Sequence, residues 1–348
     1  MIRTTVAGAG GLREFLPTHR MKLLLVLLIV FLAAGSDLHT VLGTTLAVEG
    51  THFEVDGQKK FLLGLSYYGA LGAPAEHIRR DLDHMQEHGF NWIRVWATWT
   101  AFDNDVSAVD ADGRPREKYL KRLKRLVKEA DSRGMIVDVT LSRGEWLPDQ
   151  SGHMRAVESL TKALRSFDNV YIDLGNERNI RDARYVSFEE LKALRKRVKK
   201  LDPDRLVTAS HAGVMSRQQA REYLTVAGVD FLSPHRPRNE RSPGQTKETT
   251  QRYLQWMQDM GRTVPVHYQE PFRRDFSPWQ PKAEDFVTDA RGAKKGGAAG
   301  WCLHNGSPRG PHTQGPRRSF DLRKKTLFEQ LDAEEMKAIR RMSEVLDL

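Results

Sequence analysis

Apolar runs of strand length recur along most of this chain, and helix-like segments separate them. Eight such runs stand in the sequence, at 61–66, 91–96, 135–141, 169–174, 206–210, 229–233, 264–268 and 298–303. The segments between them, for example 75–88, 116–133 and 189–201, have amphipathic spacing and are followed by glycine or proline, which commonly end helices. Because right-handed crossover connections place successive parallel strands side by side, eight consecutive units predict a closed (β/α)8 barrel.

A doubly wound parallel sheet is the competing architecture, and the sequence lacks its marks. It would need about six strands and a glycine-rich turn after the first strand. The segment 64–72 does not have that glycine spacing, and no G-x-x-x-x-G-K string occurs. We therefore predict the α/β class and a TIM barrel formed by residues 36–348 as one domain. A short N-terminal β-hairpin should precede the first strand, because Asp56-Gly57 suits a two-residue turn between 45–55 and 59–63.

The amino end has the pattern of a secretory signal peptide. Lys22 precedes an unbroken apolar run at 23–34, and small residues lie just before Ser36, as cleavage requires. We expect residues 1–35 to be this signal, with Met21 as the natural start and the residues before it an over-extended beginning. The apolar run is shorter than the roughly 20 residues that span a bilayer, so an uncleaved anchor is the lesser alternative. A secreted or periplasmic protein without stable membrane insertion is predicted.

Composition excludes several other classes of protein. The net charge is +10, but the basic residues are dispersed over segments such as 118–128 and 192–200, without the interleaved aromatics of a nucleic-acid surface. No nucleic-acid partner is therefore expected, although the charge favours contact with acidic polymers. The chain has 12 histidines without a His-Glu-x-x-His string, and no G-x-S-x-G occurs. We predict no metal and no cofactor, and the single cysteine, Cys302, excludes an intrachain disulfide.

Two glutamates follow apolar runs that lie three βα units apart. Glu177 comes after the run at 169–174, and Glu270 comes after the run at 264–268. Both would emerge at the carboxyl ends of barrel strands, where active sites are built. Hydrolysis of a glycosidic bond needs a proton donor and a second carboxylate below the sugar ring. If less polar, like-charged surroundings raise the pKa of Glu177, it would serve as the acid, and Glu270 would attack while held ionised by Arg94.

Aromatic and hydrogen-bonding residues gather at the predicted strand ends. The aromatic side chains are Tyr67, Tyr68, Trp96, Trp99, Trp146, Tyr268, Trp279 and Trp301. Sugar rings offer apolar faces to aromatic rings, so Trp96, Tyr268 and above all Trp301 are expected to bind substrate, with core packing as the alternative. His235, His304 and Asn305 would supply hydrogen bonds, although each histidine could equally be structural.

Together these motifs resemble a known family. Asn176-Glu177 closes the fourth strand, Glu270 closes the seventh, Arg94 lies on the second and Trp301 on the eighth. From residue 45 to the C-terminus the chain resembles the clan A retaining glycoside hydrolases, most closely the cellulase-like branch related to glycoside hydrolase family 5. The resemblance implies a (β/α)8 barrel, retention of anomeric configuration, Glu177 as acid/base and Glu270 as nucleophile. It also implies that Asn176 binds the sugar next to the scissile bond.

The sequence departs from that family at two loops. Many relatives have a histidine after the third strand, where residues 141–145 read Leu-Ser-Arg-Gly-Glu, and a tyrosine beyond the sixth-strand histidine, where residues 235–239 read His-Arg-Pro-Arg-Asn. The substrate therefore stays open. Arg143, Arg236 and Arg238 indicate either an acidic sugar or salt bridges with neighbouring carboxylates.

The resulting functional prediction is a secreted retaining hydrolase that cleaves β-glycosidic bonds in an oligo- or polysaccharide by double displacement. Two alternatives use the same residues: a catalytically silent carbohydrate-binding barrel and a transglycosylase. The separation of the two carboxyl groups discriminates between mechanisms, because about 5–5.5 Å is typical of retaining enzymes and about 6.5–9.5 Å of inverting ones.

Overall fold

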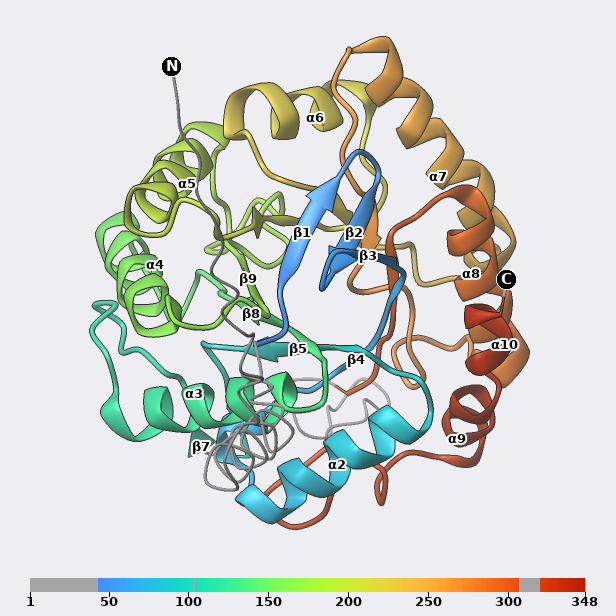
Figure 1. The fold of residues 1–348 in the computed structure, drawn as a ribbon, viewed down its shortest axis with the longest axis horizontal. Helices are drawn as coiled ribbons and strands as arrows, with labels where there is room; N and C mark the ends of the chain where they lie inside the picture. The colour runs from blue at the N-terminus through green and yellow to red at the C-terminus, as the bar shows by residue number, and fades with distance from the viewer. Residues whose placement is uncertain (1–42, 103, 307–319, 348) are drawn as a thin grey trace, which may run out of the picture. The chain divides into compact units, whose positions relative to one another are not determined.

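Parallel strands form a ring at the centre of the chain, and helices surround them (Figure 1). The computed structural model describes residues 43–102, 104–306 and 320–347. The main sheet is parallel and has the strand order β10-β9-β8-β5-β4-β14-β13. Its strands are β4 (Leu62–Ser66), β5 (Trp92–Trp96), β8 (Ile136–Thr140), β9 (Val170–Asp173), β10 (Val207–Thr208), β13 (His267–Tyr268) and β14 (Gly300–Leu303).

Short pairings close the ring between β10 and β13. Directly after β10, β11 (Ser210–His211) pairs in parallel with β12 (Ser233–Pro234). A parallel bridge between Leu232 and Val266 then joins the β12 segment to the β13 segment. Each of the eight predicted apolar runs thus contributes to the ring in chain order, which confirms the (β/α)8 barrel.

The helices lie on the outside of the ring, each between two strands. They are α2 (Ala75–Glu87), α3 (Glu117–Asp131), α4 (Gln150–Leu164), α5 (Phe188–Leu201), α6 (Arg217–Glu222) continued by η2 (Tyr223–Ala227), α7 (Ser242–Asp259) and α8 (Ala283–Gly296), followed by α9 (Ala333–Arg340) and α10 (Ser343–Leu346). Helix α5 illustrates the local cause: Ser187 and Glu190 form a capping box at its start, and Leu191, Leu194 and Val198 bury one face.

A small antiparallel sheet covers the N-terminal end of the barrel. It consists of β1 (Leu46–Glu49), β2 (His52–Val55) and β3 (Gln58–Lys60). The turn between β2 and β3 has positive φ at Asp56 (53°) and Gly57 (71°), as the predicted hairpin requires. A second turn at Gly50 divides the segment predicted as one strand, so the sheet has three strands. Phe53 of β2 packs edge-on against Phe231, 5.0 Å between ring centres.

Large side chains fill the interior of the barrel just above that sheet. Trp92 stacks on Tyr171 with 6.5 Å between ring centres and meets the His267 ring edge-on at 4.5 Å. Gly64 leaves the room that Trp92 needs, because a Cβ there would lie 2.0 Å from an indole carbon. The N-terminal half of the interior is therefore closed, and the next inward-facing positions along the strands are polar.

Two short elements lie at the opposite, C-terminal end of the barrel. The 3-10 turn η1 (Ala70–Gly72) follows β4, and the hairpin β6 (Thr100–Ala101) and β7 (Asn104–Asp105) follows β5. No helix within the described ranges is long and apolar enough to cross a membrane. The expected signal segment 1–35, with its start at Met21, lies outside the described residues.

Candidate active site

Arg94 anchors the centre of the C-terminal half of the barrel. Its side chain is fully buried on β5, and Nε donates to Asp138 Oδ2 (3.1 Å) and Thr140 Oγ1 (3.0 Å) on β8. Burial disfavours its charge, but the neighbouring carboxylates, above all Glu270, outweigh this effect and raise the pKa of Arg94 above its usual value. The guanidinium is therefore a permanent, fixed cation from which the rest of the site is built.

The other nitrogens of Arg94 reach the two motifs that the sequence singles out. Nη2 donates to Asp173 Oδ2 and to Asn176 Oδ1, each at 3.0 Å, and Nη1 donates to Glu270 Oε1 at 2.5 Å. One arginine thus connects the ends of the second, fourth and seventh strands. Asn176 is held by this contact in a defined orientation next to Glu177.

Glu270 lies after β13 with both carboxylate oxygens in contact with polar groups. Oε1 accepts from Arg94 and from the Tyr68 hydroxyl (3.3 Å), and Oε2 accepts from Arg238 Nη2 (2.7 Å). Burial acts to raise the pKa of Glu270, but the surrounding positive groups hold it well below its ordinary value. The groups that lower this pKa are His235, His304 and Arg94, in decreasing order. Burial also lowers the pKa of His304 itself, whereas Arg94 is permanently charged.

Glu177 follows β9 on a backbone turned into the left-handed region, with φ of 48°. Its amide donates to Ser210 Oγ (3.0 Å), which ties this turn to the neighbouring strand. Oε1 accepts from His235 Nδ1 (3.2 Å), and Oε2 accepts from Arg184 Nη1 (3.3 Å). A non-glycine residue with positive φ is uncommon, and such strain gathers at functional sites.

The surroundings of Glu177 differ from those expected for a proton donor. Burial acts to raise its pKa, but the hydrogen bond and charge of His235 and the charges of Arg238 and Arg184 outweigh burial and lower the pKa to about 2. The expected less polar, like-charged environment is thus not what the structure contains. Basic groups surround the Glu177 carboxylate because Arg184 and Arg238 lie in the loops that follow the fourth and sixth strands.

The two carboxylates are close to each other. Ligand atoms of Glu177, His235 and Glu270 all lie within 4.8 Å of one another. His235 Nδ1 lies between the glutamates, 3.2 Å from Glu177 and 3.6 Å from Glu270. This trio has the donor types of a metal site, but Arg238 Nη2 reaches the same two oxygens, so a cation there would meet the guanidinium charge.

The predicted histidines both face Glu270. His304 Nε2 lies 3.5 Å from Glu270 Oε2, while its Nδ1 lies 3.0 Å from Ser66 Oγ. His235 is 1% exposed, and its Nε2 has no hydrogen-bond partner within the described part of the chain. His235 therefore binds Glu177 through Nδ1 and lies close to Glu270 with the same nitrogen.

Aromatic side chains lie beside Glu270. Tyr68 stacks on Trp96, with 3.9 Å between ring centres, and packs against Trp99 at 4.4 Å. The Arg94 guanidinium lies over the Trp96 ring at 4.5 Å. Trp96 thus lies beside the paired glutamates and fixes Tyr68 against Glu270, and its contact with substrate stays a prediction.

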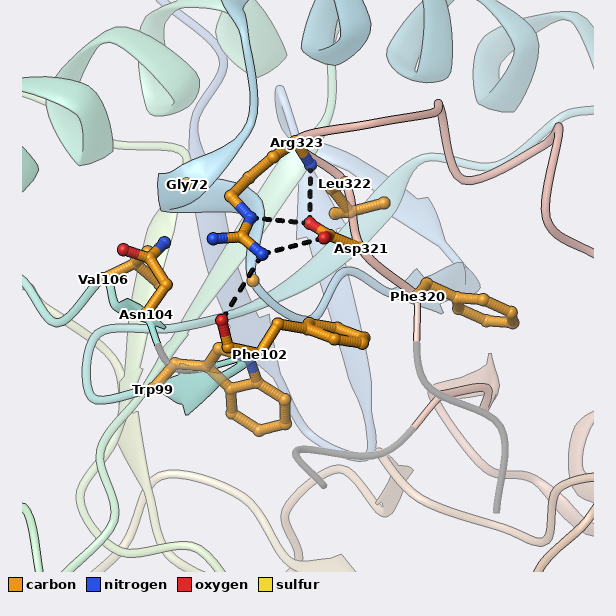
Figure 2. Close-up of a pocket in the computed structure, with 10 residues that line it drawn as sticks. Gly72, Trp99, Phe102, Asn104, Val106, Phe320, Asp321, Leu322 and Arg323 are labelled. Carbon is orange, nitrogen blue, oxygen red and sulfur yellow. Dashed lines mark hydrogen bonds and ion pairs between the residues drawn. The ribbon is translucent and has the colours of Figure 1, made fainter. Parts of the chain in front are cut away.

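A hollow with about 260 Å³ of empty space opens next to Trp99 (Figure 2). Its lining is Gly69, Gly72, Trp99, Phe102, Asn104, Val106, Phe320, Asp321, Leu322 and Arg323. Arg323 donates from Nε and Nη2 to Asp321 (2.8 Å each) and from Nη2 to the Phe102 carbonyl (3.4 Å). The loops after the first and second strands and the segment after the eighth therefore meet here, one aromatic layer away from Glu270.

Three predicted binding residues are placed elsewhere. Trp301 is fully buried and donates from Nε1 to Asp289 of α8 (2.6 Å), and the Tyr268 hydroxyl lies 2.7 Å from Thr250 Oγ1 of α7. Successive strand residues point to opposite faces, and these two point outward to the helices. The third, Asn305, donates from Nδ2 to the Ser66 carbonyl (3.1 Å) and so joins the ends of β14 and β4.

The three arginines that suggested an acidic sugar have separate environments. Arg143 pairs with Glu190 (2.8 Å), and Arg236 is buried with hydrogen bonds to Thr246 Oγ1 (3.1 Å) and the Ser242 carbonyl (3.0 Å). Arg143 therefore forms a salt bridge, and Arg236 has a structural role. Of the three, Arg238 alone contacts the paired glutamates.

Two further site residues, Asp138 and Asp173, were not predicted from the sequence. Asp138 and Asp173 are fully buried acids inside otherwise apolar strands, and both bind Arg94. A charged residue at an inward-facing strand position was the available signal, because such residues are almost never buried without a partner. Burial raises the pKa of Asp138 to about 8 although Arg94 opposes this. Arg184 gave no comparable signal.

Comparison with solved structures finds the same barrel architecture in several glycoside hydrolases. The endo-1,4-β-mannanase of Rhizomucor miehei superposes with a TM-score of 0.60, 12% identity and coverage of 87% of this chain and 99% of that chain. A glycoside hydrolase family 5 structure from Bacteroides vulgatus superposes with a TM-score of 0.65 and 16% identity, and the match covers 87% of this chain and 71% of that chain. The β-mannanase of the blue mussel Mytilus edulis superposes with a TM-score of 0.55 and 14% identity, and the match covers 86% of this chain and 96% of that chain.

These structural likenesses agree with the sequence resemblance and confirm the shared barrel fold. No protein-family model matches the sequence, and the comparison with curated proteins finds no match. Sequence identities this low show a shared fold only, so the activity has to be argued from the site itself.

Proposed function

We propose that this chain is a retaining glycoside hydrolase that cleaves β-glycosidic bonds in an oligo- or polysaccharide. Glu270 is the nucleophile and Glu177 is the acid/base. The observation that carries the proposal is the pair of carboxylates at the C-terminal end of one barrel, with ligand atoms within 4.8 Å of each other. This short separation supports retention, because an inverting enzyme needs about 6.5–9.5 Å to admit a water molecule.

The charge environment supports the role of Glu270. A nucleophile must be ionised, and Arg94 fixes Oε1 while lowering the pKa of the carboxyl group. Arg94 is in turn held by Asp138 and Asp173. Oε2 is the oxygen that would attack the anomeric carbon, because Oε1 is committed to the buried arginine.

The reaction proceeds in two balanced steps. In the first, Glu270 Oε2 bonds to the anomeric carbon, the glycosidic C–O bond breaks, and Glu177 gives its proton to the leaving oxygen. In the second, Glu177 takes a proton from water, the water oxygen bonds to the anomeric carbon, and the ester to Glu270 breaks. His235 and Asn176 stand beside these groups and would orient the sugar hydroxyls.

Glu177 has to acquire a proton before the first step. Its pKa of about 2 in the free protein leaves it ionised near neutral pH. Substrate binding must therefore remove positive charge from its vicinity or exclude the water that solvates its anion, and both changes raise a carboxyl pKa. This requirement singles out the arginines around Glu177 as groups that respond to the substrate.

The test compares wild type with Glu177→Gln and Glu270→Gln on aryl β-glycosides and polysaccharides. Loss of general acid catalysis should lower turnover by roughly 10²–10⁴-fold, and loss of the nucleophile should abolish it. The first product of wild type, followed by NMR, should keep the β configuration. Equal residual hydrolysis by all three proteins on every compound would refute the proposal.

Azide can separate the two roles. Small anions enter the space left by a truncated carboxylate, so Glu177→Ala should form a β-glycosyl azide, and Glu270→Gly should form an α-glycosyl azide. The opposite stereochemistry would exchange the roles of the two residues. An Arg143→Gln variant is the matched control, because its salt bridge to Glu190 lies outside the carboxylate pair.

A catalytically silent carbohydrate-binding barrel is the second candidate. The observation that favours it is the low pKa of both glutamates, which leaves the free protein without a protonated acid near neutral pH. Binding to a glycan array without turnover of the bound glycans would support this candidate. A transglycosylase would use the same two residues, and transfer to an added sugar in preference to water would identify it.

The same proposal includes a carbohydrate partner and export of the protein. Secretion or periplasmic delivery is inferred from the apolar run at 23–34, and cleavage before Ser36 is expected. N-terminal sequencing of protein recovered outside the cytoplasm tests this, and intact residues 1–35 would favour the uncleaved anchor. Binding to nucleic acid is not expected, and a gel-shift experiment at physiological salt would reveal it.

A further inference from the structure

Arg238 lies across both carboxylates of the site. Nη2 donates to Glu270 Oε2 at 2.7 Å and lies 3.6 Å from Glu177 Oε1. Oε2 is also the oxygen that faces away from Arg94, so the guanidinium stands where the anomeric carbon of a substrate has to approach. The side chain is 16% exposed, in contrast to the fully buried Arg94. It can therefore be reached by a ligand.

We propose that Arg238 is a specificity-determining residue that binds an anionic group of an acidic sugar, and that the substrate is a polysaccharide containing uronic acid. This inference rests on the proposed glycosidase function and adds its substrate class. In the free protein Glu270 takes the place of the substrate carboxylate. On binding, the guanidinium exchanges the Glu270 oxygen for the sugar carboxylate, which frees that oxygen to attack.

Charge balance during the reaction requires an anionic partner for Arg238, which the sugar carboxylate would supply. When Glu270 becomes a glycosyl ester it loses its negative charge, and Arg238 keeps only the longer 3.6 Å approach to Glu177. A poorly solvated guanidinium without a close anion is unfavourable. A neutral sugar offers no anion in exchange, whereas a uronic acid supplies one throughout both steps. Planar guanidinium groups pair with carboxylates in two parallel hydrogen bonds.

The surroundings hold Arg238 ready for this exchange. Its guanidinium lies 4.3 Å from the ring centre of Phe276, which supports the group from one side independently of the glutamates. Arg184 adds a second cation at the site, 35% exposed and 3.3 Å from Glu177 Oε2. His235 Nε2, buried and without a partner among the described residues, offers a further hydrogen bond to a bound polar group.

Departure of Arg238 also explains how Glu177 becomes an acid. The charge of this arginine is one of the causes that lower the pKa of Glu177. When a substrate carboxylate neutralises the guanidinium, that influence ends and the pKa of Glu177 rises, while the influence of His235 remains. The same ligand therefore frees the nucleophile and prepares the proton donor, which links substrate recognition to catalysis.

The experiment uses matched polymers of the same linkage: β-linked uronic-acid polysaccharides such as hyaluronan and poly-β-mannuronate, and the same polymers after chemical reduction of the carboxyl groups to alcohols. Turnover and binding of each pair are measured for wild type, Arg238→Gln, Arg238→Lys and the control Arg143→Gln. Wild type should prefer an acidic polymer over its reduced form by about 100-fold, the effect expected for a desolvated charge pair.

The variants then decide the role of Arg238. Arg238→Gln should bring the ratio of acidic to reduced polymer close to one, Arg238→Lys should keep part of the preference, and Arg143→Gln should leave it unchanged. A preference for the reduced polymers, or an acidic preference that survives in Arg238→Gln, overturns the inference. Either result leaves hydrolysis by Glu177 and Glu270 untouched.

Absence of turnover on all polymers would count against the glycosidase proposal, and the binding data would still test the inference. Affinity electrophoresis through gels that contain each polymer measures retardation without catalysis. Retardation by acidic polymers that disappears in Arg238→Gln and persists in Arg143→Gln supports the assigned ligand class. Equal retardation by acidic and reduced polymers, or none by either, refutes it.

Discussion

Tyr68 donates its hydroxyl hydrogen to the same oxygen of Glu270 that Arg94 holds, at 3.3 Å from Oε1. Two donors, one after the first strand and one on the second, thus fix Oε1, and the other oxygen, Oε2, accepts from Arg238. The ring of Tyr68 is itself fixed by stacking on Trp96. The orientation of the Glu270 carboxylate is therefore determined by residues that are not themselves acids.

Removal of the Tyr68 hydroxyl should affect catalysis more than folding. Tyr68→Phe keeps the stacked ring and removes a hydrogen bond to a charged group, which typically contributes about 1.5–3 kcal/mol. We expect kcat/KM to fall about 10-fold or more, with a change in Tm of a few degrees at most. Steady-state kinetics and calorimetry measure the two effects. Unchanged kinetics would show that Arg94 alone orients Glu270.

Replacement of Arg94 should destabilise the whole barrel. Arg94→Met leaves Asp138, Asp173 and Glu270 without their shared cation in a buried position. Breaking a buried ion pair by removing one partner costs about 3–5 kcal/mol. Urea unfolding near neutral pH should show a loss of this size, and the loss should shrink at low pH as the carboxyl groups become protonated. A loss that does not depend on pH would contradict this account.

Trp301 provides a test of strand orientation. Its indole donates to Asp289 on α8 and does not face the carboxylates. Trp301→Phe should lower the free energy of unfolding by about 1–3 kcal/mol, because the buried Asp289 Oδ2 loses its hydrogen-bond donor while Oδ1 keeps the bond from Thr246. The preference among substrates should stay the same. A changed substrate preference with unchanged stability would restore the original prediction of a sugar platform.

The sequence predicted the barrel because periodic apolar runs report backbone structure directly. All eight runs became ring strands, and the Asp56-Gly57 turn formed with both φ values positive. Gly50 was missed as a turn because the residues on both sides of it suit a strand. The N-terminal sheet therefore has one strand more than the hairpin predicted.

Side-chain direction was harder to predict than strand position. A shift of one residue moves a side chain from the interior of the barrel to the helical layer, and the prediction placed Trp301 and Tyr268 on the wrong side. Arg94 holds Glu270 as predicted, and His304, which was predicted to bind substrate, lies beside Glu270 as well. The pKa of Glu177 could not be derived from local sequence, because His235 and Arg238 reach it from a loop distant in the chain and the fold of its own loop brings Arg184 to it.

The low pKa of Glu177 predicts a pH-dependent contribution to stability. A carboxyl group whose pKa falls from 4.5 unfolded to about 2 folded stabilises the protein above pH 4.5, and this contribution is lost as the pH falls toward 2. The difference in unfolding free energy between wild type and Glu177→Gln should therefore increase by about 3 kcal/mol from pH 2 to pH 6. Urea unfolding at several pH values gives this difference, in which other titrating groups cancel. A constant difference would mean that Glu177 has an ordinary pKa.

The pH profile of Arg238→Gln tests the link between this arginine and the proton donor. The pH dependence of kcat/KM reports ionisation in the free enzyme. Because Glu177 must be protonated and has a pKa of about 2, kcat/KM should fall as the pH rises through the acidic range. Removal of a cation that lowers this pKa must raise it, and the descending limb should move to higher pH. Arg143→Gln should not move it, since Arg143 pairs with Glu190. A limb that stays in place in Arg238→Gln, or moves to lower pH, would show that Arg238 does not control the protonation of Glu177.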